Sequence, residues 1–252
     1  MSEVLKHCDE VLSIIMKREE VIPSAPKSLH KHDELLFEKH FANRKRIEDK
    51  TYGDLHFEEV FVNGKTLVVT PDELNSVKVA NEVANFQGDM AFIFGSGLIV
   101  DPVFSTLPKN KINIHLGLSP WYRGAATLFW PFYLLQPQFC GVTFHQISNE
   151  PDAGELIHQL VPSLEIGDTI HDVAAKCILQ AKNDLQSLFD FWKLNESFPS
   201  RQQKISGRNW RQSDFHPSML RIIYDLFDDK IVDLFLKGEI TGKFPRLFSC
   251  IK

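Results

Sequence analysis

The sequence predicts an α/β fold, built on a mostly parallel, twisted sheet with helices on both faces and a small extension at the carboxyl end. From residue 90 onward, short continuously apolar segments such as Met90–Phe94 alternate with longer amphipathic segments. Strands that are apolar throughout are typical of parallel sheets, because helices cover both faces of such sheets. The chain has 252 residues, of which 43% are hydrophobic and 11% aromatic. This is sufficient for one large domain with a sizeable core.

The amino-terminal third predicts one strand and two helices. The apolar run Val11–Met16 fits a buried strand, and residues 31–49 and 75–86 place apolar side chains at helical spacing. Asn63 and Gly64 stand between two hydrophobic segments. That pair fits either a tight hairpin turn or a loop between separate elements.

The middle of the chain supplies the other predicted strands and two more helices. We expect strands at residues 90–94, 112–116, 141–146 and 155–161, a helix rich in aromatic residues at 126–135, and a long helix from Asp168 or Thr169 to about residue 194. Sheets of this kind bind ligands at the carboxyl ends of their strands. Gly95, Asn113 and His115 all fall at such ends, which predicts a binding site there.

The carboxyl-terminal part of the chain is predicted to form a separate extension. Residues 197–216 are polar and aromatic and indicate an extended excursion, whereas residues 217–240 carry a final helical pattern. We therefore divide the chain into a catalytic domain over residues 1–196 and an extension over residues 197–252 that packs on it.

Bulk properties exclude several classes of protein. The net charge of −5 disfavours a large nucleic-acid interface. The four cysteines and the dispersed histidines lack metal-ligand spacing, so no metal site is predicted and the thiols are expected to be reduced. No apolar run is long enough to cross a membrane, and the polar start is no signal peptide. We expect a cytoplasmic protein that does not contact membranes.

A polar pair on an otherwise apolar strand is the most informative feature. Asn113 and His115 are two residues apart, so both side chains point to the same face of the strand. Asp152 follows in the segment Pro151–Gly154, where a plain turn is the alternative interpretation. An amide can stabilise an oxyanion, an imidazole can carry a proton near neutral pH, and a carboxylate can orient the imidazole. The three residues are therefore the candidate catalytic set.

At these residues the chain resembles the folate-dependent formyltransferases. That family has an Asn-x-His strand, a loop of the form Ser-Leu-Leu-Pro-x-Tyr-Arg-Gly, and a later Asp-x-Gly. Here the loop reads Gly117-Leu118-Ser119-Pro120-Trp121-Tyr122-Arg123-Gly124, and Val142-Thr143-Phe144-His145 precedes Asp152-Ala153-Gly154. The resemblance is clear over residues 88–165 and implies a Rossmann-like catalytic domain.

The resemblance implies transfer of a formyl group from N10-formyltetrahydrofolate to a primary amine. Asn113 and protonated His115 would stabilise the tetrahedral oxyanion, and His115, directly or through water held by Asp152, would take the amine proton. Residues of the pterin side are then Phe94, Gly95, Leu98, His145, Gln146, Ile147 and Asn149. Residues of the acceptor side are Ser119, Trp121, Tyr122 and Arg123, with Ser119 as a loop former rather than a nucleophile.

Within the family, the sequence is most similar to enzymes that modify nucleotide-linked amino sugars. The expected acceptor is a small nucleotide-linked 4-amino deoxysugar, without nucleic acid, and a homodimer is the candidate assembly. A methionyl-tRNA formyltransferase-like enzyme, a formyltetrahydrofolate hydrolase and an inactive folate-binding relative are the alternatives. Family members usually begin with a strand and a short turn ahead of the segment that Val11–Met16 resembles. Either that first unit is missing here, or Val11–Met16 takes its place.

Overall fold

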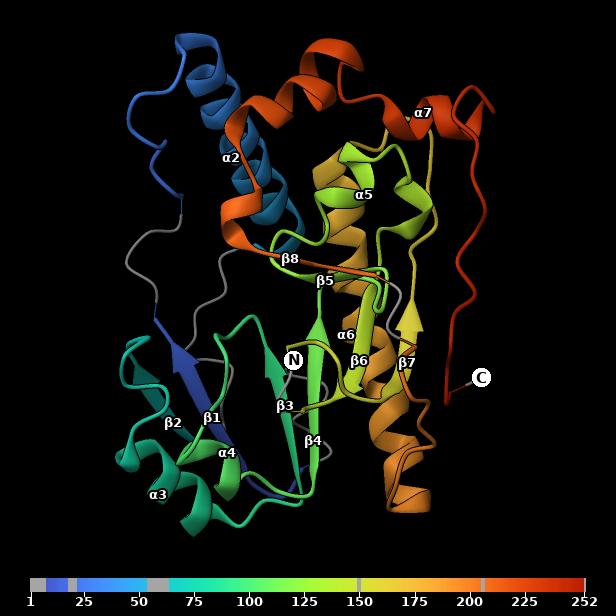
Figure 1. Cartoon of the computed structure of the whole chain (residues 1–252). Helices are drawn as coiled ribbons and strands as arrows, with labels where there is room; N and C mark the ends of the chain where they lie inside the picture. The colour runs from blue at the N-terminus through green and yellow to red at the C-terminus, as the bar shows by residue number, and fades with distance from the viewer. Residues whose placement is uncertain (1–7, 18–21, 54–63, 149–150, 205–206, 252) are drawn as a thin grey trace.

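The computed structural model describes residues 8–17, 22–53, 64–148, 151–204 and 207–251, and Figure 1 shows how they are arranged. The strands of the described residues form three sheets: β1–β2, the four-stranded sheet β3–β4–β6–β7, and the small pair β5–β8. The strand bounds are β1 Val11–Met16, β2 Gly64–Val69, β3 Met90–Phe94, β4 Asn110–His115, β5 Tyr122–Gly124, β6 Val142–Gln146, β7 Leu156–Leu160 and β8 Arg208–Trp210.

The α/β class is confirmed, and parallel pairing predominates among the described strands. The pairs β1–β2, β3–β4 and β5–β8 are parallel, whereas β6 runs antiparallel to both of its neighbours, β4 and β7. The helices are α2 Lys31–Tyr52, α3 Val77–Phe86, α4 Val103–Thr106, α5 Trp130–Tyr133, α6 Ile170–Asn195 and α7 Ile231–Leu236, with shorter turns η2 Pro137–Phe139, η3 Gln212–Asp214, η4 Pro217–Met219 and η5 Ile222–Leu226.

Two predicted helices are shorter than expected. The segment 126–135 is helical only in α5. Pro131 lies in the first turn of this helix, where proline is tolerated, and because it has no N–H the helix does not extend further toward residue 126. The pattern over residues 217–240 is divided into η4, η5 and α7. Asp228 and Asp229, both with positive φ, interrupt it between η5 and α7. The Asn63–Gly64 turn falls largely outside the described residues, since only Gly64 is described and it begins β2.

The two faces of the four-stranded sheet differ in chemistry. Ile112, Ile114 and Phe144 share one face, where α6 packs against β6 and β7. Asn113 and His115 point to the other face, and the register pairs them with His145 and Thr143 of β6. A polar site therefore lies on a sheet whose opposite face forms the main core.

The long helix α6 begins where the sequence predicts. Thr169 caps it in a capping box with Asp172, which satisfies backbone donors of the first turn. Val173, Cys177 and Leu188 of this helix are fully buried against the sheet. A second, smaller core lies under β1 and β2, where Val69, Val79 and Val103 pack with residues of α3 and α4.

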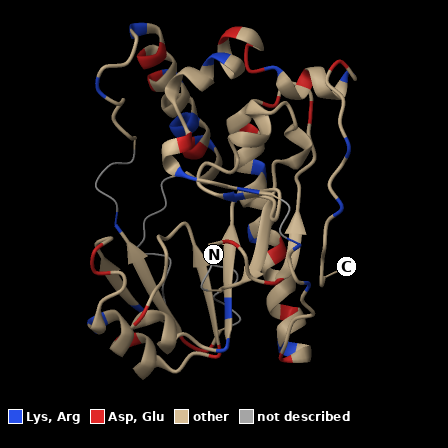
Figure 2. Ribbon diagram, viewed as in Figure 1, with Lys and Arg blue, Asp and Glu red and all other residues tan. Residues whose placement is uncertain are grey.

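Charged residues of both signs are interspersed along α2 and α6 (Figure 2). On α2, Arg44 pairs with Glu48 at 2.7 Å and Lys45 pairs with Asp49 at 2.6 Å, one helical turn apart. None of the helices in the described part of the chain is both long and apolar enough to span a bilayer.

Two buried histidines meet between α2 and α6. The rings of His40 and His171 have centroids 4.5 Å apart, and the Tyr224 hydroxyl lies 2.9 Å from His40 Nδ1. Burial lowers the pKa of His171 to about 4 and also holds the pKa of His40 well below its usual value. Both rings are therefore neutral at neutral pH, as core histidines.

Candidate active site

The site begins at the end of β4, where Asn113 and His115 face the same way. The neighbouring strand β3 runs parallel to β4, so Gly95 follows Phe94 beside the end of β4. Across the sheet, Asn113 lies opposite His145 of β6. The antiparallel direction of β6 thus adds a second imidazole to the predicted set.

Asp152 closes the cluster from the loop between β6 and β7. Its Oδ1 accepts a hydrogen bond from Asn113 Nδ2 at 3.1 Å and lies 3.4 Å from His115 Nδ1. Its Oδ2 accepts a hydrogen bond from the backbone N–H of Gly124 at 2.9 Å. The structure therefore brings the three predicted catalytic residues together, with Asn113 and His115 both within 3.4 Å of the Asp152 carboxylate.

Two glycines permit this approach. A Cβ on Gly154 would lie 1.6 Å from the carbonyl oxygen of Gln146, so only glycine lets the Asp152 loop pack against β6. Gly124 has φ +88, and a Cβ there would lie 2.1 Å from the carbonyl oxygen of Trp210. The left-handed backbone and the close strand contact both require glycine at this position.

His115 is held by a hydrogen bond at Nε2, and its Nδ1 faces Asp152. Its Nε2 lies 3.0 Å from the Tyr122 carbonyl oxygen, which can only accept, so Nε2 carries a proton and Nδ1 presents its lone pair toward Asp152 in the neutral ring. Burial lowers the pKa of His115 below its usual value, although the Asp152 charge and the Tyr122 carbonyl act to raise it. The ring is thus neutral at neutral pH and can accept a proton at Nδ1.

Asp152 remains ionised in this environment. Burial opposes its charge, but contacts from His145 and His115 and the Gly124 N–H outweigh burial and lower the pKa of Asp152 to about 2. A proton that reaches His115 Nδ1 would therefore be stabilised by a carboxylate 3.4 Å away.

His145 takes a place that sequence reasoning missed. The prediction assigned it to the pterin side, but its ring is 2% exposed and Nε2 lies 3.2 Å from Asn113 Nδ2 and 3.4 Å from Asp152 Oδ1. Its Nδ1 donates to the Gln146 carbonyl at 2.8 Å, which leaves Nε2 facing Asn113 and Asp152. The Asn113 amide nitrogen therefore has two partners within the cluster, Asp152 and His145.

The other predicted pterin-side residues lie at two places. Phe94 is the last residue of β3, and Gly95 and Leu98 follow it; Phe94 is 51% and Leu98 54% exposed. Gln146 and Ile147 lie at the end of β6, where the Ile147 N–H donates to the Lys111 carbonyl. Asn149 lies outside the described residues.

The predicted acceptor residues separate into two groups. Ser119 is fully buried, its N–H donates to Thr143 Oγ1, and its own hydroxyl has no partner among the described residues. Tyr122 is also buried, with its hydroxyl donating to Gln136. Both side chains are therefore buried, and their contact with an acceptor stays a prediction.

Trp121 and Arg123 are the other two predicted acceptor residues. Trp121 is partly exposed and meets the Phe139 ring edge-on. The Arg123 side chain is 8% exposed, and its Nε has no hydrogen-bond partner within the described ranges. Burial is the largest cause that lowers the pKa of His115, and the positive charge of Arg123 makes a smaller contribution in the same direction. Arg123 thus places a buried cation close enough to act on the polar cluster.

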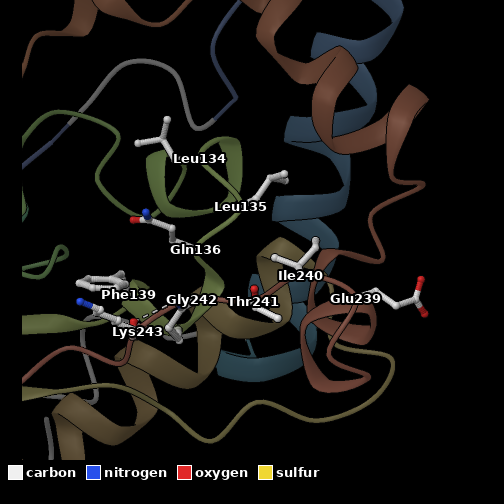
Figure 3. Close-up of a pocket in the computed structure, with 10 residues that line it drawn as sticks. Leu134, Leu135, Gln136, Phe139, Glu239, Ile240, Thr241, Gly242 and Lys243 are labelled. Carbon is white, nitrogen blue, oxygen red and sulfur yellow. Dashed lines mark hydrogen bonds between the residues drawn. The ribbon is translucent and has the colours of Figure 1, made fainter.

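The structure also has a cavity of about 510 Å³, and Figure 3 shows the side chains that line it. Its walls come from the segments around α5 and η2 and from the turn after α7, including Leu135, Phe139 and Thr241. It contains none of the predicted site residues, so the polar cluster and the cavity are different places. In the described part of the chain, no group of three or more His, Cys, Asp or Glu residues is arranged to hold a metal ion.

The family to which this geometry corresponds is found by comparison with known proteins. A family model described as formyl transferase matches residues 33–187. The chain belongs to the formyl transferase family. The matched range contains β4, β6 and the Asp152 loop, and the predicted family is confirmed.

Individual relatives of this formyl transferase are distant. A methionyl-tRNA formyltransferase from Buchnera aphidicola subsp. Schizaphis graminum (strain Sg) is 29% identical over 112 residues, which cover 44% of this chain and 35% of that protein. The match therefore spans about a third of that relative.

Two solved structures share the fold at low sequence identity. The formyltransferase PseJ from Anoxybacillus kamchatkensis, solved with UDP-4,6-dideoxy-4-formamido-L-AltNAc and tetrahydrofolate, is similar over 91% of this chain and 99% of that chain, with 19% identity and a TM-score of 0.55. A 4-N formyltransferase from Francisella tularensis is similar over 82% and 78%, with 17% identity and a TM-score of 0.50.

Proposed function

We propose that the protein transfers a formyl group from N10-formyltetrahydrofolate to the primary amine of a nucleotide-linked amino deoxysugar. The observation that carries this proposal is the convergence of Asn113, His115 and Asp152 on one polar face of the sheet. Membership of the formyl transferase family supports the formyl group as the unit transferred.

The cluster has the groups that the reaction needs. The amine attacks the formyl carbon, which forms a C–N bond and converts the carbonyl oxygen into an oxyanion. An N–H of Asn113 is the donor for that oxyanion once substrate replaces one of its present partners, Asp152 or His145. The amine proton passes to His115 Nδ1, and Asp152 stabilises the resulting imidazolium. The C–N bond to the folate then breaks, and the leaving nitrogen takes back a proton.

The donor side is proposed at the end of β3. Phe94 and Leu98 expose apolar side chains there, next to the end of β4. A flat pterin ring is an apolar body with a polar edge, so exposed apolar side chains suit it. Gly95 has φ +62 and open space at its Cβ position, which leaves the backbone of this turn accessible.

The acceptor side is proposed at the β5 loop. The buried guanidinium of Arg123 and the partly exposed ring of Trp121 lie within three residues of each other on this loop. A cation suits the diphosphate of a nucleotide sugar, and an aromatic ring suits a sugar or a base. The fold is also that of a protein solved with a UDP-linked formamido sugar, which makes this class the first to test.

The test is a screen of UDP-, dTDP- and GDP-linked amino sugars with N10-formyltetrahydrofolate. We expect one acceptor to gain the mass of one formyl group, with release of one tetrahydrofolate per product. Formate released without an amine would instead indicate a hydrolase, and folate binding without turnover would indicate an inactive relative. Formylation of methionyl-tRNA alone would contradict the small-molecule acceptor.

A further inference from the structure

A glutamine from the carboxyl-terminal segment contacts the backbone of the catalytic loop. Gln203 is 8% exposed, and its Nε2 donates to the carbonyl oxygens of Asp152 at 2.8 Å and Gly154 at 2.7 Å. Both partners can only accept, which fixes the orientation of the amide. Gln203 lies outside residues 33–187, which the family model matches. Its buried side chain therefore bridges Asp152 and Gly154 from a separate part of the chain.

The bonded loop is in an unfavourable backbone conformation. Asp152 has φ +51, a left-handed value that a non-glycine residue adopts at a cost of about 1 kcal/mol or more. Such a conformation persists only where the surroundings hold it. Gln203 holds the two carbonyls on either side of Ala153, and the Gly124 N–H holds the Asp152 carboxylate.

The rest of the same segment anchors both sides of the site. Arg201 exchanges two backbone hydrogen bonds with Leu156 of β7, at 2.8 and 2.9 Å. Four residues after Gln203, a Cβ on Gly207 would lie 1.6 Å from the Pro120 carbonyl, so the chain runs directly against the β5 loop. β8 then pairs with β5, whose Gly124 donates to Asp152. Figure 1 shows β8 passing along β5 above the end of β4.

We propose that Gln203 is a positioning residue for the reaction: its two hydrogen bonds hold the Asp152 loop so that the carboxylate faces His115 and Asn113. The role rests on the proposed formyl transfer, because Asp152 is assigned there. It adds to that proposal a residue from the carboxyl-terminal extension, so the extension takes part in forming the site rather than only covering the core.

The experiment compares Gln203→Met with the matched control Gln202→Met. Methionine keeps nearly the shape of glutamine but has no N–H to donate, and Gln202 is exposed at the adjacent position. Gln203→Asn is a second variant, which keeps an amide but has a shorter reach. Two readouts are taken from each folded protein: the NMR pH titration of the His115 imidazole without ligands, and kcat and KM for formyl transfer.

We expect the His115 titration of Gln203→Met to move to lower pH, because the Asp152 charge no longer lies beside Nδ1. The kcat should fall about 10- to 100-fold, as for a reacting group displaced by about 1 Å, with each KM within about threefold of wild type. The His115 titration and the kcat of Gln203→Asn should lie between those of Gln203→Met and wild type. Both values for Gln202→Met should match wild type.

An unchanged His115 titration and a kcat within about twofold of wild type in both Gln203 variants would overturn the proposal. A fall in kcat that follows only a lower melting temperature, with the titration unmoved, would also overturn it, since that pattern indicates a purely structural residue. The titration is measured without substrate. It therefore decides the role of Gln203 even if the wild-type protein transfers no formyl group, a result that would count against the proposed function alone.

Discussion

Protonation of the buried His171 should destabilise the folded protein below neutral pH. Burial lowers its pKa from 6.5 to about 4. A base whose pKa is lower in the folded state is protonated first in the unfolded state. Its contribution to stability is therefore complete above pH 6.5 and is lost as the pH falls toward 4. His40, 4.5 Å away, acts in the same direction.

The size of this pH-dependent loss of stability follows from the pKa of His171, which is 6.5 in the unfolded chain and about 4 in the folded protein. Between about pH 7.5 and about pH 5.5, His171 should lower the free energy of unfolding by about 1.3 kcal/mol. This figure depends little on the folded value, because at pH 5.5 it is the unfolded chain that gains the proton. Asp229 opposes it, since burial raises the pKa of that carboxyl to about 6 and its protonation favours the folded state.

Urea unfolding at the two pH values measures this change for wild type, for His171→Gln and for the exposed control His216→Gln. The pH-dependent loss of stability should be smaller by about 1.3 kcal/mol in His171→Gln than in wild type, and His216→Gln shows what replacing an exposed histidine does on its own. Because Asp229 is present in all three proteins, its opposing effect cancels, and the difference reports His171 together with its interaction with His40. Equal pH dependence in wild type and His171→Gln would refute the reasoning.

Three further predictions concern the site itself. Asp152→Asn removes the carboxylate charge. The pKa of Asp152 is about 2 in the folded protein against an ordinary value of 3.8, so the surroundings favour that charge by about 2.4 kcal/mol. We expect kcat to fall about 50-fold in initial-rate assays, and a rate within threefold of wild type would contradict the assigned role. His145→Leu should lower kcat about tenfold, because it leaves the Asn113 amide without one of its partners, whereas unchanged kinetics would make His145 a core residue only. Gly154→Ala should lower the free energy of unfolding by more than about 2 kcal/mol, measured by urea unfolding, because its Cβ would lie 1.6 Å from the Gln146 carbonyl; wild-type stability would mean that the loop can shift.

Much of the fold follows from local patterns. The strands β1, β3, β4, β6 and β7 lie where short apolar runs predict them, and α6 lies where a capping residue precedes a long amphipathic pattern. The three-residue strands β5 and β8 carry no such pattern. They exist because the β5 loop and the carboxyl-terminal segment pair with each other in three dimensions.

The candidate site was predictable to a similar extent. Alternation along a strand places Asn113 and His115 on one face, and the resemblance adds Asp152. The role of His145 depends on the antiparallel register of β4 and β6, which pairs it with Asn113 and which no local pattern specifies. Gln203 comes from a distant segment, so only the folded chain reveals its contact with the Asp152 loop.

The central claim is that the Asn113–His115–Asp152 cluster carries out formyl transfer, and single-residue replacement of Asn113 tests it most directly. The measurement is the rate at which an amino-sugar acceptor gains one formyl group from N10-formyltetrahydrofolate, for wild type and for Asn113→Ala of matched thermal stability. We predict transfer by wild type and a loss of about 10²- to 10³-fold in the variant, the usual effect of removing an oxyanion donor. Equal rates in the two proteins would contradict the account.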